Sequence, residues 1–217
     1  LNIEALQSIQ AKGPYYLCGH SFGSWVALEM ALQLQNAGHE VAQLIVLDTG
    51  IPSEKDLSRV ANWDDSEWLM IISKTIGDTY NQNLNISLED LHGLAWDDQV
   101  QLLYSKMNEN GLIDEHSGLE DVRSLVEMYK AQAQTLYEPE SFKIKKIALI
   151  RAETVLDGFL EGMPLEMQND PVWGWAKFSQ ESPTLEYVLG NHLTMVQMPN
   201  AKDLAAKMNT LLQRSET

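Results

Sequence analysis

A serine between two glycines lies where the hydropathy pattern changes from that of a strand to that of a helix. The apolar segment Tyr15–Gly19 (YYLCG) is typical of a buried strand. Over residues 22–36 apolar side chains recur about every four positions, which predicts an amphipathic helix. The apolar run Leu44–Leu47 then indicates a second buried strand, of the kind found in parallel sheets. Ser21 therefore lies in the turn of a strand–turn–helix–strand unit.

Residues 19–23 read Gly-His-Ser-Phe-Gly, which fits the G-x-S-x-G spacing of a nucleophile elbow. In such an elbow the serine occupies a sharp turn, and we expect the glycines on both sides to permit the close backbone approach. The helix dipole and the backbone N–H of Phe22 would then face an oxyanion formed at the serine. A serine that merely caps a helix does not need both glycines. We therefore predict that Ser21 is a nucleophile.

A nucleophilic serine needs a base to take its proton and an acid to hold that base. In α/β-hydrolases these residues follow in the order serine, acid, histidine. His192 is the candidate base, because it lies between the strand-like segment 184–190 and an amphipathic helix predicted for residues 201–212. The other four histidines have simpler interpretations as turn, loop or surface residues, and they are His20, His39, His92 and His116.

Two regions of the chain could supply the acid. Asp48 ends the strand that follows the predicted elbow helix, whereas Glu153 and Asp157 follow the later apolar segment 146–153 (KIALIRAE). An aspartate at the start of a loop often only bonds to backbone amides, which is the ordinary alternative for Asp48. The residues alone favour Asp48 and leave Glu153 as the alternative acid.

Three segments resemble the thioesterase domains that end nonribosomal peptide synthetases and modular polyketide synthases. They are GPYYLCGHSFGSWVALEMALQLQNAGHEVAQLIVLDTGIP, IALIRAE and VLGNHLTMV, and the likeness is strong over residues 3–52 and moderate over residues 144–212. The resemblance implies an α/β-hydrolase fold, with a mostly parallel sheet flanked by helices. Residues 1–52 and 141–217 would form its core, and residues 53–140 an inserted helical lid. Two positions depart from the family pattern: Ser24 replaces a second glycine, and Asn191 stands where an aspartate often precedes the histidine.

The resemblance implies that Ser21, Asp48 and His192 act together, with the Phe22 N–H in the oxyanion hole. The substrate would be a thioester on the phosphopantetheine arm of an acyl- or peptidyl-carrier protein, released by hydrolysis or macrocyclisation. No metal or bound cofactor would be needed. Stand-alone editing thioesterases usually keep the acid after the later strand, so an editing thioesterase or general serine esterase using Glu153 is the alternative.

The family has several strands ahead of the elbow and a loop there that donates a second oxyanion N–H. Only 20 residues precede Ser21 in this chain. We therefore expect N-terminal strands to be missing and the elbow strand to lie at an edge of the sheet. With one oxyanion donor, the 217 residues alone are expected to have reduced activity or to be an inactive fragment that serves only as an interaction module.

Composition limits the partners and the compartment. The formal charge is −16, with 15 basic and 31 acidic residues, which argues against nucleic acid as a ligand. Carrier proteins are also acidic, so docking would need a local basic patch. The densest candidate comprises Lys143, Lys145, Lys146 and Arg151, although a solvated entry to the following strand is the simpler interpretation of these residues. The single cysteine, Cys18, allows no internal disulfide. With no membrane span or signal peptide in the sequence, we expect a soluble, cytoplasmic protein.

Overall fold

The computed structural model describes residues 2–51, 62–114, 116–139, 142–155 and 164–215. The chain divides into two compact units. One unit, which we call the sheet unit, comprises Leu1–Lys55 and Leu136–Thr217. The other, the helical unit, comprises Asp56–Thr135. Each unit has its own apolar core and is described by itself.

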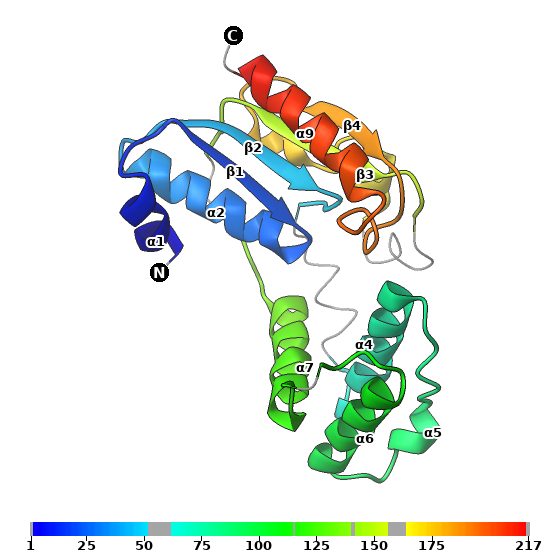
Figure 1. The fold of residues 1–217 in the computed structure, drawn as a ribbon. Helices are drawn as coiled ribbons and strands as arrows, with labels where there is room; N and C mark the ends of the chain where they lie inside the picture. Colours follow the sequence, from blue (N-terminus) through cyan, green and yellow to red (C-terminus); the bar gives the residue numbers. More distant parts are fainter. Residues whose placement is uncertain (1, 52–61, 115, 140–141, 156–163, 216–217) are drawn as a thin grey trace. The chain divides into compact units, whose positions relative to one another are not determined.

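The sheet unit is built on four parallel strands in the order β1-β2-β3-β4 (Figure 1). These are β1 (Tyr15–His20), β2 (Val41–Leu47), β3 (Ile147–Ala152) and β4 (Thr184–Val188). The parallel sheet confirms the sequence prediction. As expected, β1 lies at an edge of the sheet among the described strands. Because all four strands run the same way, the loops after them meet at one edge of the sheet.

Helices cover both faces of this sheet (Figure 1). Leu44 and Val46 of β2 pack in the core formed with α2 (Phe22–Asn36), whereas Ile45 and Leu47 pack in the core formed with α9 (Ala201–Ser215). Successive side chains of a strand point to opposite faces, so both neighbours in the sequence are buried. This explains why every residue of β2 is buried and why its second half, Leu44–Leu47, is a continuous apolar run.

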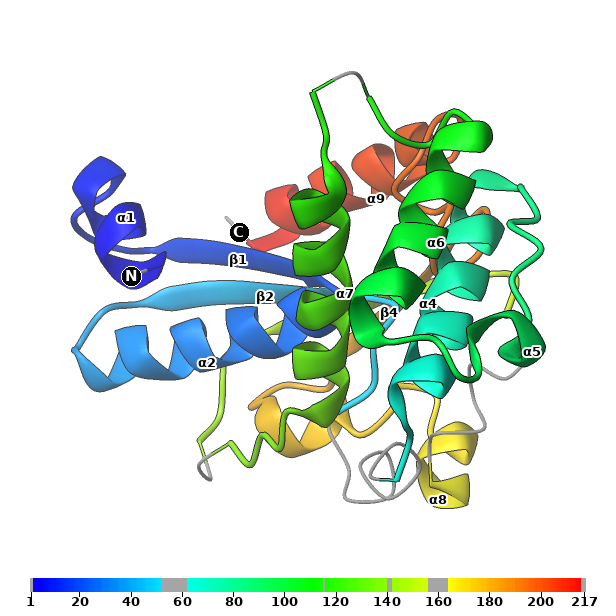
Figure 2. The same cartoon turned by 90° about the horizontal axis from the view of Figure 1, so that it is seen from below.

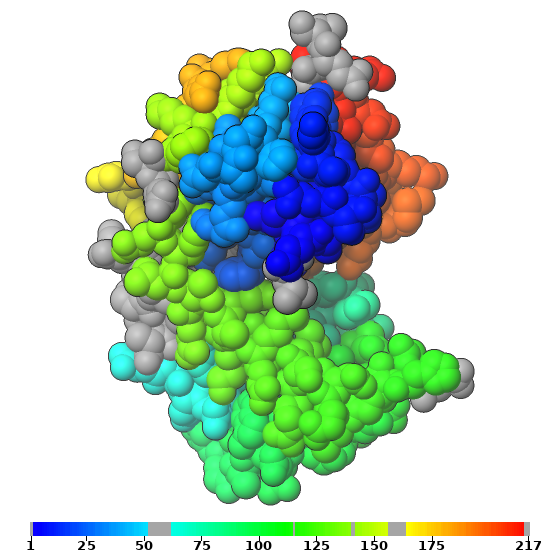
Figure 3. All heavy atoms as spheres, turned by 90° about the vertical axis from the view of Figure 1, so that its left-hand side faces the viewer, coloured from blue at the N-terminus to red at the C-terminus, as the bar shows by residue number. Residues whose placement is uncertain are grey.

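Shorter elements complete the sheet unit: α1 (Asn2–Ile9), α8 (Leu165–Asn169) and a 3-10 helix, η1 (Trp175–Phe178). In Figure 3, α1 (dark blue) lies on the surface beside the lighter blue segment that leads from α2 into β2. The side chain of Gln7 contacts His39 Nε2 at 2.9 Å, and the ring of Tyr15 packs edge-on against His39. His39 is thus half-buried and helps hold α1, rather than being the solvated loop residue that the sequence suggested.

The helical unit contains α4 (Asp65–Tyr80), α5 (Leu88–Leu91), α6 (Trp96–Glu109) and α7 (Leu119–Gln134). Its described residues form no strand, and α6 packs against both α4 and α7 (Figure 2). The capping box expected at the start of α5 is present, because Ser87 and Asp90 bond reciprocally. None of the described helices is long and apolar enough to span a membrane. The lid role of residues 53–140 stays a prediction.

The buried face of α2 can be tested with two substitutions in the same helix. Leu28 is fully buried, so Leu28→Ala should lower the free energy of unfolding by about 2–5 kcal/mol. Gln33 is exposed, and Gln33→Ala should change that free energy by less than about 0.5 kcal/mol. Urea unfolding followed by tryptophan fluorescence measures both. Similar losses in the two variants would contradict the assignment of the buried face.

Candidate active site

Ser21 occupies the turn between β1 and α2 in a conformation that few non-glycine residues adopt. Its backbone angles are φ 53° and ψ −133°. Such a conformation costs about 1–3 kcal/mol and persists only where surrounding contacts enforce it. Among the described contacts of α2, the Ser21 hydroxyl makes no capping hydrogen bond with the helix. The capping interpretation of Ser21 therefore loses its basis, and the turn has the strained geometry of a nucleophile elbow.

The two glycines beside Ser21 are not equivalent. A Cβ atom on Gly19 would lie 2.5 Å from the Ser24 Cα and still closer to the Gly23 carbonyl, so no side chain fits there. A Cβ atom on Gly23 would meet no described atom within 4 Å. The expectation that both glycines are needed was wrong, because only Gly19, on β1, lies against the backbone of α2.

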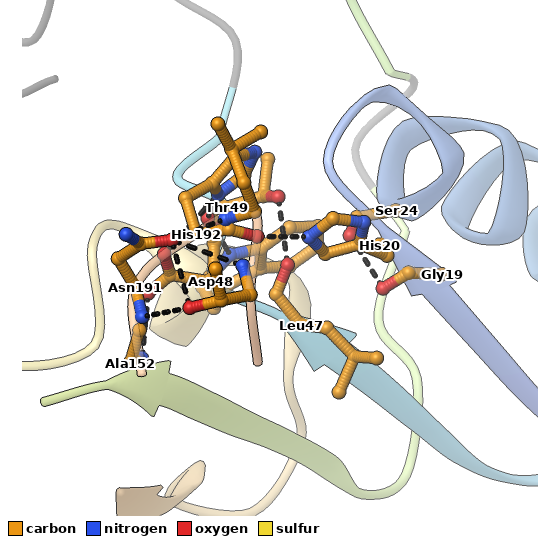
Figure 4. Close-up of polar contacts among 12 residues, drawn as sticks. Gly19, His20, Ser24, Leu47, Asp48, Thr49, Ala152, Asn191 and His192 are labelled. Carbon is orange, nitrogen blue, oxygen red and sulfur yellow. Dashed lines mark hydrogen bonds and ion pairs between the residues drawn. The ribbon is translucent and has the colours of Figure 1, made fainter. Parts of the chain in front are cut away.

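Ser24 links the strand and the helix across this turn. Its side chain is fully buried, and its Oγ donates a 2.8 Å hydrogen bond to the Gly19 carbonyl (Figure 4). A glycine at this position could not make that bond. The departure from the family pattern at Ser24 thus adds a contact that supports the elbow.

Asp48 follows β2 directly, one position beyond the residue that pairs with His20. It has a positive φ of 49°, which aspartate tolerates better than most residues. Its buried carboxylate is bonded in two directions (Figure 4). Oδ1 accepts a 2.9 Å hydrogen bond from the Ala152 N–H at the end of β3, and Oδ2 lies 3.1 Å from His192 Nδ1.

Two tryptophans hold the loop that follows Asp48. The Trp25 indole donates a 3.0 Å hydrogen bond to the Gly50 carbonyl, and the Trp175 indole donates a 2.6 Å bond to the Thr49 carbonyl. These indoles belong to α2 and η1, so two helices hold the start of this loop in place. Sequence analysis gave these tryptophans no such role.

The ring of His192 has a defined hydrogen-bonding state. Its Nδ1 lies 3.1 Å from both Oδ2 and the backbone carbonyl oxygen of Asp48. A backbone carbonyl can only accept, so Nδ1 must carry a proton. In the neutral ring Nε2 is then unprotonated and able to accept a proton, as a general base requires.

Asn191 shapes the turn that carries His192. Its Oδ1 accepts hydrogen bonds of 3.0 Å from the Leu193 N–H and 2.9 Å from the Thr194 N–H. These bonds need only an acceptor oxygen, which an amide supplies as well as a carboxylate does. Asn191 therefore accepts the same two backbone hydrogen bonds that an aspartate could accept at this position.

The other candidates belong to other elements of the chain. Glu153 is exposed beyond β3, where its backbone N–H bonds to the Val188 carbonyl, and Asp157 lies outside the described residues. His92 and His116 are exposed residues of the helical unit. The candidate basic patch is divided, because residues 143–146 precede β3 at the amino end of the sheet, as a solvated strand entry would, and only Arg151 lies toward the other end.

The sequence interpretation of His20 as a turn residue missed its contact with the candidate base, His192 (Figure 4). The ring centroids of His20 and His192 are 4.8 Å apart, and His20 Nε2 lies 2.8 Å from the His192 carbonyl oxygen. Burial lowers the pKa of His20, and the charge of nearby His192 lowers it further. The sequence held one hint of this role, which is that His20 directly precedes the candidate nucleophile Ser21.

The difference between the two elbow glycines gives a matched test. Gly19→Ala should lower the free energy of unfolding by about 1–3 kcal/mol, because the methyl group meets backbone that cannot move freely. Gly23→Ala should be neutral or raise it by up to about 1 kcal/mol, since the site is open and helical. Urea unfolding measures both. Equal losses in the two variants would contradict the asymmetry.

The chain is similar to known proteins in both sequence and structure. The model of the Thioesterase domain family matches residues 1–212. Chondramide synthase from Chondromyces crocatus is 27% identical over 222 residues, covering 95% of this chain and 5% of the synthase. Indigoidine synthase from Dickeya dadantii is 26% identical over 215 residues, covering 94% of this chain and 13% of the synthase. The chain thus spans a small part of these curated relatives.

Solved structures share the fold. A four-domain nonribosomal peptide synthetase bound to AMP and glycine matches 97% of this chain and 15% of its own, with a TM-score of 0.81 and 22% identity. The Vlm2 thioesterase domain bound with a dodecadepsipeptide matches 95% of this chain and 70% of its own, with a TM-score of 0.62 and 16% identity. These likenesses confirm the expected α/β-hydrolase fold. Because the family model covers nearly the whole sequence, this chain belongs to the thioesterase domain family.

Proposed function

We propose that Ser21, His192 and Asp48 form a catalytic triad that releases a carrier-bound chain. The chain would be an acyl, peptidyl or polyketide group carried as a thioester on the phosphopantetheine arm of a carrier protein. The observation that carries this proposal is the 3.1 Å contact between His192 Nδ1 and the buried carboxylate of Asp48. That pair lies at the edge of the sheet where β1 leads into the strained turn of Ser21.

In the first step the Ser21 Oγ attacks the thioester carbonyl carbon, and its proton passes to His192 Nε2. The carbon–sulfur bond then breaks, and His192 returns the proton to the departing phosphopantetheine sulfur. The product is an acyl-serine. Asp48 keeps His192 in the Nδ1–H tautomer and stabilises the cation that forms transiently, because its carboxylate is buried beside that ring.

In the second step His192 removes a proton from the incoming nucleophile and gives it to the departing Ser21 oxygen. Water as the nucleophile yields a free acid, whereas a hydroxyl or amine within the chain yields a ring. The backbone N–H of Phe22 is at the first position of α2, where no intrahelical acceptor is available to it. It would bind the oxyanion in both steps, and neither step needs a metal or a bound cofactor.

A carrier protein as partner is supported by the curated relatives, which are large synthases and synthetases. The divided lysine patch does not support it, because residues 143–146 lie at the amino end of the sheet and the candidate triad lies at the carboxyl end. A docking surface near the triad would therefore have to use other residues than those three lysines.

The alternative enzyme is an editing thioesterase or general serine esterase that uses Glu153 as its acid. The bonding of Asp48 to both His192 and Ala152 favours the chain-terminating class, since the resemblance associates an acid after this strand with that class. A non-catalytic interaction module is the remaining alternative, and the labelling experiment below separates it from both enzymes.

Covalent labelling tests the nucleophile. The thioesterase domain NocB has been captured as a covalent complex with a fluorophosphonate, which makes that reagent class a suitable probe. We expect a fluorophosphonate to add its mass to the peptide containing Ser21, and Ser21→Ala to abolish the addition. Hydrolysis of an acyl-pantetheine thioester should fall at least about a thousandfold in the same variant. If intact mass spectrometry finds no label on the folded chain, the 217-residue chain by itself is no serine hydrolase.

The identity of the acid is tested by two amide substitutions. Asp48→Asn should reduce kcat for the thioester by about 10⁴-fold, because an amide at this site can stabilise the wrong tautomer of His192. Glu153→Gln should change kcat by less than about twofold, since that side chain is exposed. Steady-state kinetics with matched protein concentrations measure both. A larger loss for Glu153→Gln would support the editing thioesterase or esterase instead.

A further inference from the structure

We propose that His20 is a positioning residue for His192. Its Nε2–H binds the backbone carbonyl of His192 while its ring packs on the imidazole, and together these contacts hold the base against Asp48. The inference rests on the proposed function, in which His192 is the general base. It adds to the triad a fourth residue, His20, which acts on the reaction only through His192.

Two independent contacts join the same pair of residues. The His20 Nε2 to His192 carbonyl distance is 2.8 Å, which is short for a nitrogen donor, and the rings lie 4.8 Å apart at an interplanar angle of 32° (Figure 4). One contact fixes the main chain of His192 and the other restricts its side chain. A residue that only filled space would not need to make both.

The two residues lie in different kinds of structure, one in a paired strand and the other in a segment of turns. His20 is the last residue of β1 and is paired in register with Leu47 of β2. His192 lies in a segment of turns between β4 and α9, where Asn191 supplies local hydrogen bonds. The strand therefore provides a fixed point for the loop, and His20 transmits the position of the sheet to the base.

The tautomers of both rings follow from their acceptors. The His192 carbonyl can only accept, so the proton of His20 is on Nε2, whereas the Asp48 carbonyl requires the proton of His192 on Nδ1. The two neighbouring imidazoles thus carry their protons on different nitrogens, Nε2 in His20 and Nδ1 in His192. Loss of the His20 donor would release the His192 main chain and allow its ring to leave the Nδ1–H arrangement.

A neutral His20 is also compatible with the charge that His192 gains. The pKa of His20 is lowered by burial and by His192, while its bond to the His192 carbonyl and the charge of Asp48 act in the opposite direction. On balance the pKa of His20 is lowered, which favours the uncharged ring. An uncharged ring beside His192 does not repel the cation that His192 becomes during acyl transfer.

A matched pair of variants separates the hydrogen bond from packing. His20→Gln keeps an N–H donor near the position of Nε2, whereas His20→Met has a similar length and no donor. His39→Met is the control, because His39 also bonds through its ring but lies between α1 and β1. The chain labelled with ¹⁵N-histidine gives the tautomer of His192 by NMR, with the resonance assigned from His192→Gln. Fluorophosphonate labelling of Ser21 gives a rate on the same samples.

We expect wild type, His20→Gln and His39→Met to retain the Nδ1–H tautomer of His192. His20→Met should populate the Nε2–H tautomer and label about threefold to tenfold more slowly, the effect of losing one neutral hydrogen bond. His20→Gln should label within about twofold of wild type. Urea unfolding reports stability, and His20→Phe, which keeps a ring without the donor, replaces His20→Met if that variant does not fold.

An unchanged His192 spectrum and labelling rate in His20→Met would overturn the inference. Equal losses in His20→Gln and His20→Met would also overturn it, because the hydrogen bond would then not be the positioning contact. Absence of label on wild-type Ser21 would instead count against the proposed function. The NMR comparison reports the position of His192 without catalysis, so it decides the role of His20 in that case as well.

Discussion

The carboxylate of Asp48 holds together two parts of the sheet unit that are far apart in the sequence. Oδ1 binds the end of β3 and Oδ2 binds His192, so one buried side chain fixes both a strand terminus and the candidate base. Such a group is stable only where hydrogen bonds replace its lost hydration. The loop after Asp48 is held in turn by the indoles of Trp25 and Trp175. Removal of this carboxylate should therefore affect the arrangement of the site and not its charge alone.

Two residues of the candidate site have strained backbone conformations, and neighbouring contacts hold the turn of Ser21 in place. Ser21 and Asp48 both have positive φ values, which are unfavourable for residues with side chains. The close approach of α2 to Gly19 and the bond from Ser24 to that strand residue keep the turn of Ser21 closed. The backbone of the turn is thus held in place, and Ser24, at a position where the family usually has a glycine, adds one of the hydrogen bonds that hold it.

Much of this arrangement could be predicted from the sequence, because periodicity and turn residues act locally. The apolar run that became β2, the helix after Ser21 and the capping box at Ser87 all follow from residues near one another along the chain. The G-x-S-x-G spacing then selected Ser21, and the order serine, acid, histidine together with its place before the last helix selected His192. The choice between Asp48 and Glu153 remained a preference, since both follow apolar strands and local patterns cannot say which strand end the histidine reaches.

Only the tertiary structure decided the contacts between these elements. Parallel pairing of β1, β2 and β3 sets Asp48 beside the end of β3, and the turn after β4 brings His192 to Asp48 across 144 residues of sequence. The same packing turns His20 toward the base and leaves Gly23 in open space, both against expectation. Sequence alone determined the elements and the residue types at their ends. Which side chains meet depends on strand order and loop path, and these are fixed by burial of the whole sheet rather than by any local pattern.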